Sequence, residues 1–291
     1  MQNYFLKNNF LCASVDSLGA ELNSFKINSS DEELIWQAYK NVWPRHAPVL
    51  FPIVGKLKND QYSYQNKNYS LPQHGFARDS NFVLIKQNKT QLQFELTSNK
   101  ETLPVYPFHF SLIIGYELIE KELIISYKVF NPDNKNLLFS IGAHPGFNCR
   151  RINGESLSDF ELQFKNINKL TIEKLSNGLL SGEKNKLKLQ TNKLKLKKEL
   201  FENDALVLKN SQVSEISLSS GKSKTRITLE CNNWPYFGIW TKPGCEDFIC
   251  LEPWFGIADN ENTNGKLREK EGIIAIKPYQ IFETFYKIMI K

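Results

Sequence analysis

Two histidines and one glutamate have the sequence surroundings best suited to chemistry. His74 lies in Pro-Gln-His-Gly-Phe-Ala-Arg, where Gly75 lets the backbone turn beside the imidazole. His144 lies in Gly-Ala-His-Pro-Gly-Phe, a sharp turn after an expected strand that leaves one side of the ring open. Glu252 follows an apolar run and precedes Pro-Trp, which is unusual for a surface glutamate. Carboxylates and imidazoles at strand ends are typical groups for proton transfer, so we interpret these three as catalytic candidates.

Some of the polar residues also have a purely structural interpretation. Glu252 is also compatible with a strand-end carboxylate that caps backbone amides. Asp204, in Phe-Glu-Asn-Asp-Ala, is either a site residue or part of a common Asn-Asp turn. His109 lies in an aromatic strand and is interpreted as structural, whereas His46 has no assigned role.

The sequence lacks the motifs that are typical of several classes of enzyme. No two of the four histidines have the spacing of a metal-binding motif, and the five cysteines contain no Cys-x-x-Cys pair. Gly-x-Ser-x-Gly, Gly-x-x-x-x-Gly-Lys-Ser/Thr and Gly-x-Gly-x-x-Gly are also missing from the sequence. We therefore expect no metal and no cofactor, and proton transfer as the chemistry.

Composition and charge limit the partners. The 291 residues are 41% hydrophobic and carry a formal net charge of +6, which is too mild to indicate nucleic-acid binding. No apolar run approaches the ~18–20 residues of a membrane span, and the first residues lack the pattern of a signal peptide. We expect a cytoplasmic protein, monomeric or homodimeric, that binds a small molecule and neither nucleic acid nor membrane.

The elements that would position these residues read as strands. Polar and apolar residues alternate over several segments, and turn residues recur every 8–14 residues, which favours a sandwich or barrel. No linker or repeat divides the chain, so a single domain over 1–291 is expected, with a short helix predicted only around 30–38. The expected strands are a hairpin over 62–71 and runs over 91–96, 110–118, 122–130, 212–219, 224–230 and 236–240.

A lysine-rich stretch over 184–198 has two interpretations. Its seven lysines could form a basic binding face. Its leucines, however, are spaced two apart, at positions 187, 189, 194 and 196, as in strands with one buried side. We favour two solvated strands whose lysines point outward and protect a sheet edge.

Five segments together carry a resemblance to a known family. In their order along the chain, they resemble motifs of the aldose 1-epimerase (galactose mutarotase) superfamily. The resemblance implies an all-β fold, a large antiparallel β-sandwich of the galactose mutarotase type, with the site in a cleft across one sheet. The segments are Pro44-Arg-His-Ala-Pro-Val-Leu-Phe-Pro-Ile-Val-Gly-Lys56, Leu71-Pro-Gln-His-Gly-Phe-Ala-Arg78, Gly142-Ala-His-Pro-Gly-Phe147, Phe201-Glu-Asn-Asp-Ala205 and Cys250-Leu-Glu-Pro-Trp254.

The resemblance implies a role for each matching residue. Glu252 would be the base on the C1 hydroxyl of a sugar, and His144 the acid that protonates the ring oxygen. His74 would hold the sugar near its ring oxygen, and Asp204 would bind hydroxyl groups. Independently of the resemblance, the aromatic rings of Trp254 and Phe255 could stack on the apolar face of a sugar. We expect His144 protonated and Glu252 ionised in the free enzyme, because neighbouring opposite charges favour one another.

One departure from the family leaves the substrate open. Well-known galactose mutarotases carry an arginine in an Asn-Arg-Ile context where this chain has Lys56 between Gly and Leu. The chain also resembles hexose-6-phosphate 1-epimerases, which implies that Arg45, Lys56 and Arg78 could hold a phosphate. The expected activity is anomer interconversion of a hexose. The alternatives are the same reaction on a hexose 6-phosphate, or a sugar-binding module without turnover.

Overall fold

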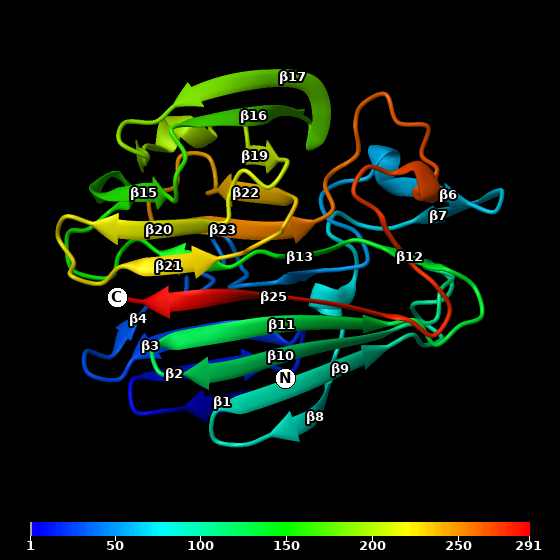
Figure 1. The fold of residues 1–291 in the computed structure, drawn as a ribbon, viewed down its shortest axis with the longest axis horizontal. Coiled ribbons are helices and arrows are strands. Elements are labelled where there is room, and N and C mark those ends of the chain that lie inside the picture. Colours follow the sequence, from blue (N-terminus) through cyan, green and yellow to red (C-terminus); the bar gives the residue numbers. More distant parts are fainter. Residues whose placement is uncertain (1) are drawn as a thin grey trace.

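The fold of this chain is built from antiparallel strands. A computed structural model describes residues 2–291, which form 25 strands and five short 3₁₀-helices (Figure 1). In these residues no helix has the length and apolar character needed to cross a membrane. The all-β fold class predicted from the sequence is confirmed.

A nine-stranded sheet forms one layer of the molecule. Its spatial order is β18-β15-β20-β21-β25-β11-β10-β9-β8, and all neighbouring strands are antiparallel. The strands are β8 (Val83–Gln87), β9 (Gln91–Thr97), β10 (Ser111–Ile119), β11 (Glu122–Phe130), β15 (Phe160–Phe164), β18 (Lys193–Lys195), β20 (Glu215–Ser220), β21 (Ile227–Glu230) and β25 (Ile281–Ile290).

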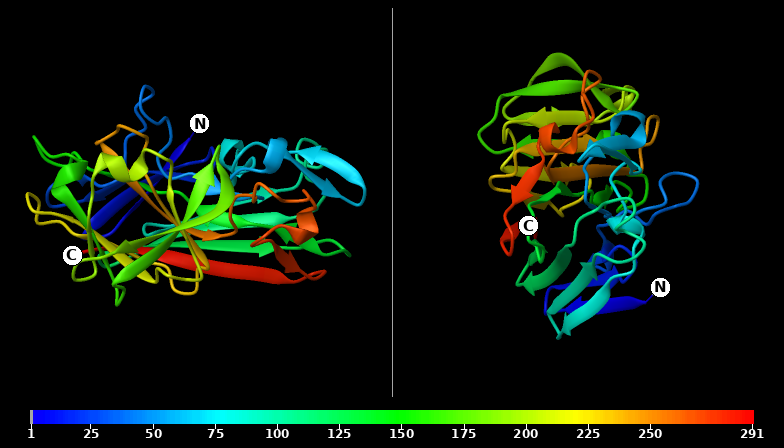
Figure 2. Two further views of the ribbon diagram at one scale, coloured as in Figure 1. Left: turned by 90° about the horizontal axis from the view of Figure 1, so that it is seen from above. Right: turned by 90° about the vertical axis from the view of Figure 1, so that its right-hand side faces the viewer.

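An eight-stranded sheet carries Glu252 and Trp254 on β23. Its order is β17-β16-β19-β22-β23-β13-β5, and β14 also pairs with β23. The strands are β5 (Val49–Leu50), β13 (Ile141–Ala143), β14 (Gly146–Asn148), β16 (Lys169–Ser176), β17 (Leu179–Lys188), β19 (Leu206–Lys209), β22 (Tyr236–Trp240) and β23 (Phe248–Phe255). Figure 2 shows the layered arrangement of the strands from two further sides.

Three smaller sheets and five 3₁₀-helices form the rest of the fold in residues 2–291. One sheet is β1 (Asn3–Lys7), β2 (Leu11–Asp16), β3 (Glu21–Ile27) and β4 (Glu32–Glu33). The two others have two strands each: the hairpin of β6 (Gln61–Tyr64) with β7 (Lys67–Ser70), and β12 (Leu137–Phe139) with the distant β24 (Ile274–Ile276). The 3₁₀-helices are η1 (Lys58–Asp60), η2 (Ala77–Asp79), η3 (Leu157–Asp159), η4 (Lys198–Phe201) and η5 (Leu267–Glu269).

The large sheets share one apolar core. Leu251 of β23 and Ile288 of β25 belong to the same cluster of buried side chains, which extends along the chain from Leu6 to Ile290. Because side chains alternate along a strand, β23 sends Leu251 into this core and its neighbours, including Glu252, to the opposite face. That second face is also covered, so β23 is buried on both sides.

The predicted strands are confirmed with small shifts at their ends. The 62–71 hairpin is β6 and β7, joined by Gln65 and Asn66, whose φ values of 49° and 61° suit a tight hairpin turn. The helix predicted around 30–38 is wrong. The segment is extended: the N–H of Leu34 bonds to Phe25 O, and that of Trp36 bonds to Gly146 O. Leu34 to Trp36 are all buried, which one face of a helix would not allow.

The lysine-rich stretch forms two edge strands, as favoured from the sequence. β17 is the edge of the eight-stranded sheet, and β18 is the edge of the nine-stranded sheet. Leu189, Leu194 and Leu196 are buried, whereas the lysines between them are exposed or half-buried.

Candidate active site

Glu252 stands at the centre of the eight-stranded sheet. Cys250, Glu252 and Trp254 alternate onto the face of β23 that points away from the main core. Glu252 is only 1% exposed. A carboxylate this deeply buried is costly unless it has a partner or a function.

His144 lies directly across from Glu252. β13 precedes His144 and β14 follows it, and both strands pair with β23 in one continuous register. This register sets Gly142 against Trp254 and Gly146 against Cys250. His144 occupies the break between these two strands, so its ring meets the carboxylate from the neighbouring strand. Its Nε2 is 3.2 Å from Glu252 Oε2, although the angles do not satisfy a hydrogen bond.

Two glycines make room for the indole of Trp254. A Cβ at Gly238, on the neighbouring β22, would lie closer than 3.0 Å to the indole ring, and one at Gly142 would lie 2.7 Å from its Cδ1. Neither glycine has a positive φ, so space rather than backbone conformation requires them. The indole therefore lies flat across three strands.

A loop after β7 brings His74 to the same place. His74 and Gly75 both have positive φ, and a Cβ on Gly75 would collide with the carbonyl of Phe51. The N–H of Gly55 donates to His74 Nδ1 at 3.2 Å. Nδ1 is therefore an acceptor, and in the neutral ring the proton sits on Nε2. The rings of His74 and His144 meet edge to face at 5.6 Å.

Aromatic side chains that no sequence motif indicated as site residues enclose His144. The Trp43 ring stacks on His144 at 5.0 Å between centroids and 28° between planes, and Trp240 meets it edge-on at 5.7 Å. Trp43 is contributed by the segment before β5, whose position is set by tertiary contacts such as the hydrogen bond from Trp36 Nε1 to Trp43 O. The Trp-Pro-Arg-His context of Trp43 was the one signal available in the sequence.

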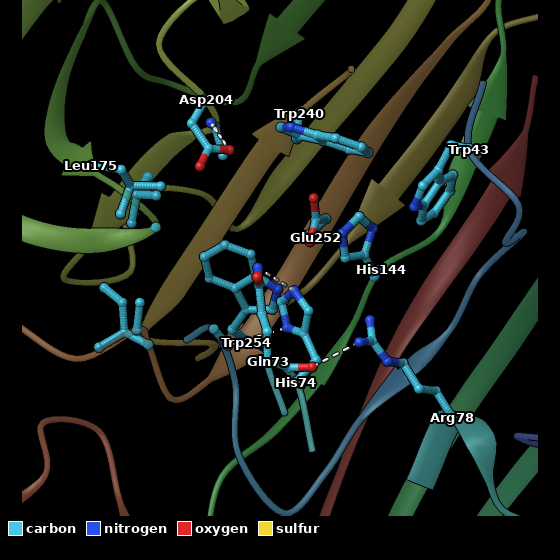
Figure 3. A pocket seen from close by; sticks show the side chains of 16 residues that line it. Trp43, Gln73, His74, Arg78, His144, Leu175, Asp204, Trp240, Glu252 and Trp254 are labelled. Atoms are coloured by element: carbon cyan, nitrogen blue, oxygen red, sulfur yellow. Dashed lines mark hydrogen bonds and ion pairs between the residues drawn. The ribbon is translucent and has the colours of Figure 1, made fainter. Parts of the chain in front are cut away.

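These side chains line one cavity of about 280 Å³ (Figure 3). Sites for small molecules start at about 300 Å³, so this cavity is of a size for a compact ligand. Asp204 reaches it from the turn before β19, with φ of 81° and its Oδ1 held by the N–H of Ala205 at 2.8 Å. The polar and aromatic residues that line the cavity are Trp43, Gln73, His74, Arg78, His144, Asp204, Trp240, Glu252 and Trp254.

The three basic candidates occupy different places. Arg78 lines the cavity and donates from a terminal nitrogen to Gln73 O at 2.7 Å, while its buried Nε has no hydrogen-bond partner. Arg45 is outside the lining and bonds to Asp79 at 2.8 Å. Lys56 is also outside it and donates to Asn177 O at 3.3 Å. Of the remaining histidines, neither His46 nor His109 contributes to the cavity wall.

Burial dominates the electrostatics of the pair. It lowers the pKa of His144 to about 3, and the positive charges of Arg78 and Arg45 act in the same direction. It raises the pKa of Glu252 well above the ordinary value, helped by Asp204 and opposed by the nearby Trp254 indole N–H, which makes no hydrogen bond of normal geometry. Burial also lowers the pKa of His74 well below its usual range.

This result differs from the charge state expected from the sequence. We expected an imidazolium beside a carboxylate, but low-dielectric surroundings disfavour both charges. The physical reason is that burial penalises each ion before the partner can compensate for it. The pair is neutral overall, with its one proton on Glu252 and an uncharged imidazole at His144.

Comparisons with known proteins identify one family. A family model described as Aldose 1-epimerase matches residues 2–269. The chain is 31% identical over 294 residues to Protein LacX, chromosomal, of Lactococcus lactis subsp. lactis, with 98% of each chain covered.

Solved structures with the same fold include two with strong similarity. One is described as a galactose mutarotase related enzyme from Lactobacillus acidophilus, with a TM-score of 0.94, 35% identity, and coverage of 100% of this chain and 97% of that one. Another is a galactose mutarotase-like protein from Lactobacillus casei ATCC 334, with a TM-score of 0.91, 29% identity and full coverage of both chains. The resemblance and the β-sandwich architecture predicted from sequence motifs are thereby confirmed.

Proposed function

The chain belongs to the aldose 1-epimerase family, and we propose that it interconverts the α and β anomers of a free hexose. The observation that carries this proposal is the contact between His144 and Glu252 on the wall of a cavity of monosaccharide size. Anomer exchange needs one group that gives a proton and one that takes a proton at adjacent oxygens of the sugar. His144 Nε2 and Glu252 Oε2 are two such groups, and they lie 3.2 Å apart on the cavity wall.

The proposed reaction begins with ring opening. Glu252 takes the proton of the C1 hydroxyl while His144 gives a proton to the ring oxygen O5. The C1–O5 bond breaks, and the electrons of the former O1–H bond form the C1=O1 double bond of the open-chain aldehyde. Rotation about C1–C2 presents the other face of the aldehyde to O5, and the two proton transfers then run backwards to close the ring.

The proton count of the pair matches this scheme. Each opening step transfers one proton to Glu252 and one from His144, so the total held by the pair is unchanged. The pair needs one proton in total, and burial favours that total in the free protein. The directions of the two pKa shifts place this proton on Glu252, so the scheme requires its transfer to His144 before the ring opens. General acid–base assistance of this kind is worth ~10²–10⁴-fold in rate.

The remaining wall residues provide sugar binding in this proposal. His74 carries its proton on Nε2, which lies 3.3 Å from the side-chain amide of Gln73, and a sugar oxygen near O5 would replace that contact as acceptor while the ring stays neutral. Asp204, which lines the same cavity, accepts hydrogen bonds from hydroxyl groups of the sugar. Trp254 presents a flat apolar surface to the ring's C–H groups.

An exchange measurement tests the activity directly. Magnetisation transfer between the anomeric protons of glucose and galactose is recorded by NMR with and without the protein. We expect exchange faster than in buffer for at least one hexose. His144→Asn is the matched variant, because it keeps a planar polar side chain but cannot donate an imidazole proton, and it is expected to lose at least ~10²-fold of the added rate. Exchange at the buffer rate for every hexose would refute the proposal.

A hexose 6-phosphate is the second candidate substrate, and one observation favours it. The Arg78 guanidinium lines the cavity, and its buried Nε makes no hydrogen bond, although it lies 3.7 Å from Asp79 Oδ2. Arg45 lies outside the lining and bonds to the same Asp79, which reduces what it can offer a phosphate. Glucose and glucose 6-phosphate are compared in the same exchange assay, with Arg78→Ala as the variant. A preference for the phosphate of tenfold or more that Arg78→Ala removes would replace the free hexose as substrate.

A further inference from the structure

A third reactive side chain lies beside His144 and Glu252 and has no part in the proposed reaction. Cys250 precedes Glu252 by two residues on β23, so both side chains are on the same face of the sheet. Its thiol is free, and the residue is completely buried. The neighbours across the sheet are Gly146 and Trp240.

The geometry of the three side chains is close to that of a metal site. A ring nitrogen of His144, the Sγ of Cys250 and a carboxylate oxygen of Glu252 lie within 4.8 Å of one another. Zinc binds sulfur at ~2.3 Å and nitrogen or oxygen at ~2.0–2.2 Å, so tetrahedral ligands are about 3.4–3.6 Å apart. The 3.2 Å contact between His144 and Glu252 is already near this value. The longest separation in the set needs a closure of about 1 Å.

A second observation concerns unsatisfied polar atoms at the same place. Glu252 Oε2 is buried without a hydrogen-bond partner, as is His144 Nδ1. Buried polar atoms are normally satisfied, and an unsatisfied carboxylate oxygen is among the most costly exceptions. A cation in contact with Oε2 would satisfy it.

The charges of the set select a divalent, thiophilic cation. Thiolate, carboxylate and neutral imidazole together carry a charge of −2, so one divalent ion makes the buried site neutral. Asp204 adds negative potential at Glu252, while Arg78 and Arg45 oppose a cation at His144. A sulfur and a nitrogen ligand favour Zn²⁺ or Cd²⁺ over Mg²⁺ and Ca²⁺, which prefer oxygen.

We propose that His144, Cys250 and Glu252 form an inhibitory binding site for Zn²⁺, with its fourth coordination position open to the sugar cavity. A bound ion occupies the imidazole nitrogen and the carboxylate oxygen, so neither group is free to transfer a proton to or from a sugar. The binding claim stands independently of the reaction, whereas the inhibition claim rests on the proposed function.

Metal titration with an optical probe tests the binding. Cd²⁺ is added to the wild-type protein, and the thiolate-to-metal charge-transfer absorption is followed in the ultraviolet, with Zn²⁺ as competitor. We expect one strong site. Cys250→Ala should weaken it by at least ~10-fold, since even an outer-shell change costs a metal site 10–100-fold. Cys245→Ala is the matched control, because Cys245 packs against the same buried cluster as Cys250 but is outside the set of three.

The same variants test the inhibition. Zn²⁺ should slow anomer exchange by the wild-type protein and by Cys245→Ala, and a chelator should restore it. Cys250→Ala should keep its exchange activity and lose sensitivity to that Zn²⁺ concentration. If Cys250→Ala does not fold, Cys250→Ser replaces it, and X-ray absorption of the wild-type zinc complex must show one sulfur and two nitrogen or oxygen protein ligands.

Two results would overturn the proposal: equal Cd²⁺ affinity in the wild type and the Cys250 variant, or loss of the strong site in Cys245→Ala. Failure of the enzymatic proposal has a different signature. In that case the Cd²⁺ band appears and depends on Cys250, but the protein accelerates no anomer exchange.

Discussion

The space above Gly238 sets the orientation of Trp254, and Gly238→Ala tests this. A methyl group at this position would lie closer than 3.0 Å to the indole, whereas ordinary contacts start at 3.4 Å. The indole must therefore move by about 1 Å, out of its flat position. Added methyl groups in a packed interior cost about 1–3 kcal/mol. The variant is thus expected to lower the free energy of unfolding by that amount.

The same displacement should affect sugar handling. Gly238 pairs with Glu252 in the sheet, so the shifted indole moves within the cavity beside the carboxylate. Misplacement of a positioning group by about 1 Å costs up to ~10²-fold in catalysis. We expect kcat/KM for anomer exchange to fall by 10- to 100-fold, measured by NMR exchange, while urea unfolding reports the stability.

Gly221→Ala is the matched control, because a Cβ there meets no atom within 4 Å and the glycine has no positive φ. This control should leave both measurements nearly unchanged. Combining Gly238→Ala with Trp254→Phe should recover part of the lost stability, since the smaller ring vacates the space. Unchanged stability and unchanged kcat/KM in Gly238→Ala would refute the packing described here.

Two further predictions concern the proton pair and the loop after β23. Adding a second proton to the His144–Glu252 pair creates a buried cation, and removing the one it holds creates a buried anion. Burial therefore moves the acid limb of kcat/KM below 4.5, the ordinary pKa of glutamate, because the pKa of His144 falls to about 3. The alkaline limb is the loss of the proton from Glu252 and lies well above 4.5. A pH profile corrected for the buffer reaction should be flat through 4.5, and a limb with its midpoint there would contradict this. Lys270 bonds to Asp259 at 2.8 Å, with both side chains at most 4% exposed. Lys270→Met leaves Asp259 as an uncompensated buried charge and should cost about 3–5 kcal/mol in urea unfolding. The surface pair Lys266–Glu269 is the control, because Lys266→Met should cost less than about 1 kcal/mol; equal costs for the two variants would contradict the assigned burial.

Much of the fold was predictable because it depends on local patterns. Alternation at period two and the turn at Gln65 and Asn66 predicted strands and a hairpin that the structure contains. The helix expected around 30–38 failed because tertiary hydrogen bonds to Phe25 and Gly146 determine that segment. One continuous apolar core from Leu6 to Ile290 supports the expected single domain, which we retain as a proposal.

The candidate site was only partly predictable. Motifs indicated His74, His144, Asp204 and Glu252, and the fold brings all four to one cavity. The sequence did not indicate the stacking of Trp43 on His144, because it depends on a loop positioned by distant strands. The place of Cys250 beside His144 likewise requires the register of β14 against β23. Pairing partners of this kind are three-dimensional facts that a single sequence does not contain.

The neutral state of the proton pair also required the structure. The acid and base roles implied by the resemblance suggested mutual stabilisation of opposite charges, whereas the 1% exposure of Glu252 makes desolvation the larger effect.

The role of Glu252 as the base is the central claim, and Glu252→Gln tests it most directly. The amide keeps the shape and the hydrogen-bonding capacity of the side chain but cannot take a proton from O1. Anomer exchange and sugar binding are measured by NMR on the same samples of wild-type and variant protein. We expect exchange slower by at least ~10²-fold with sugar binding largely retained. Exchange by Glu252→Gln at close to the wild-type rate would contradict this role.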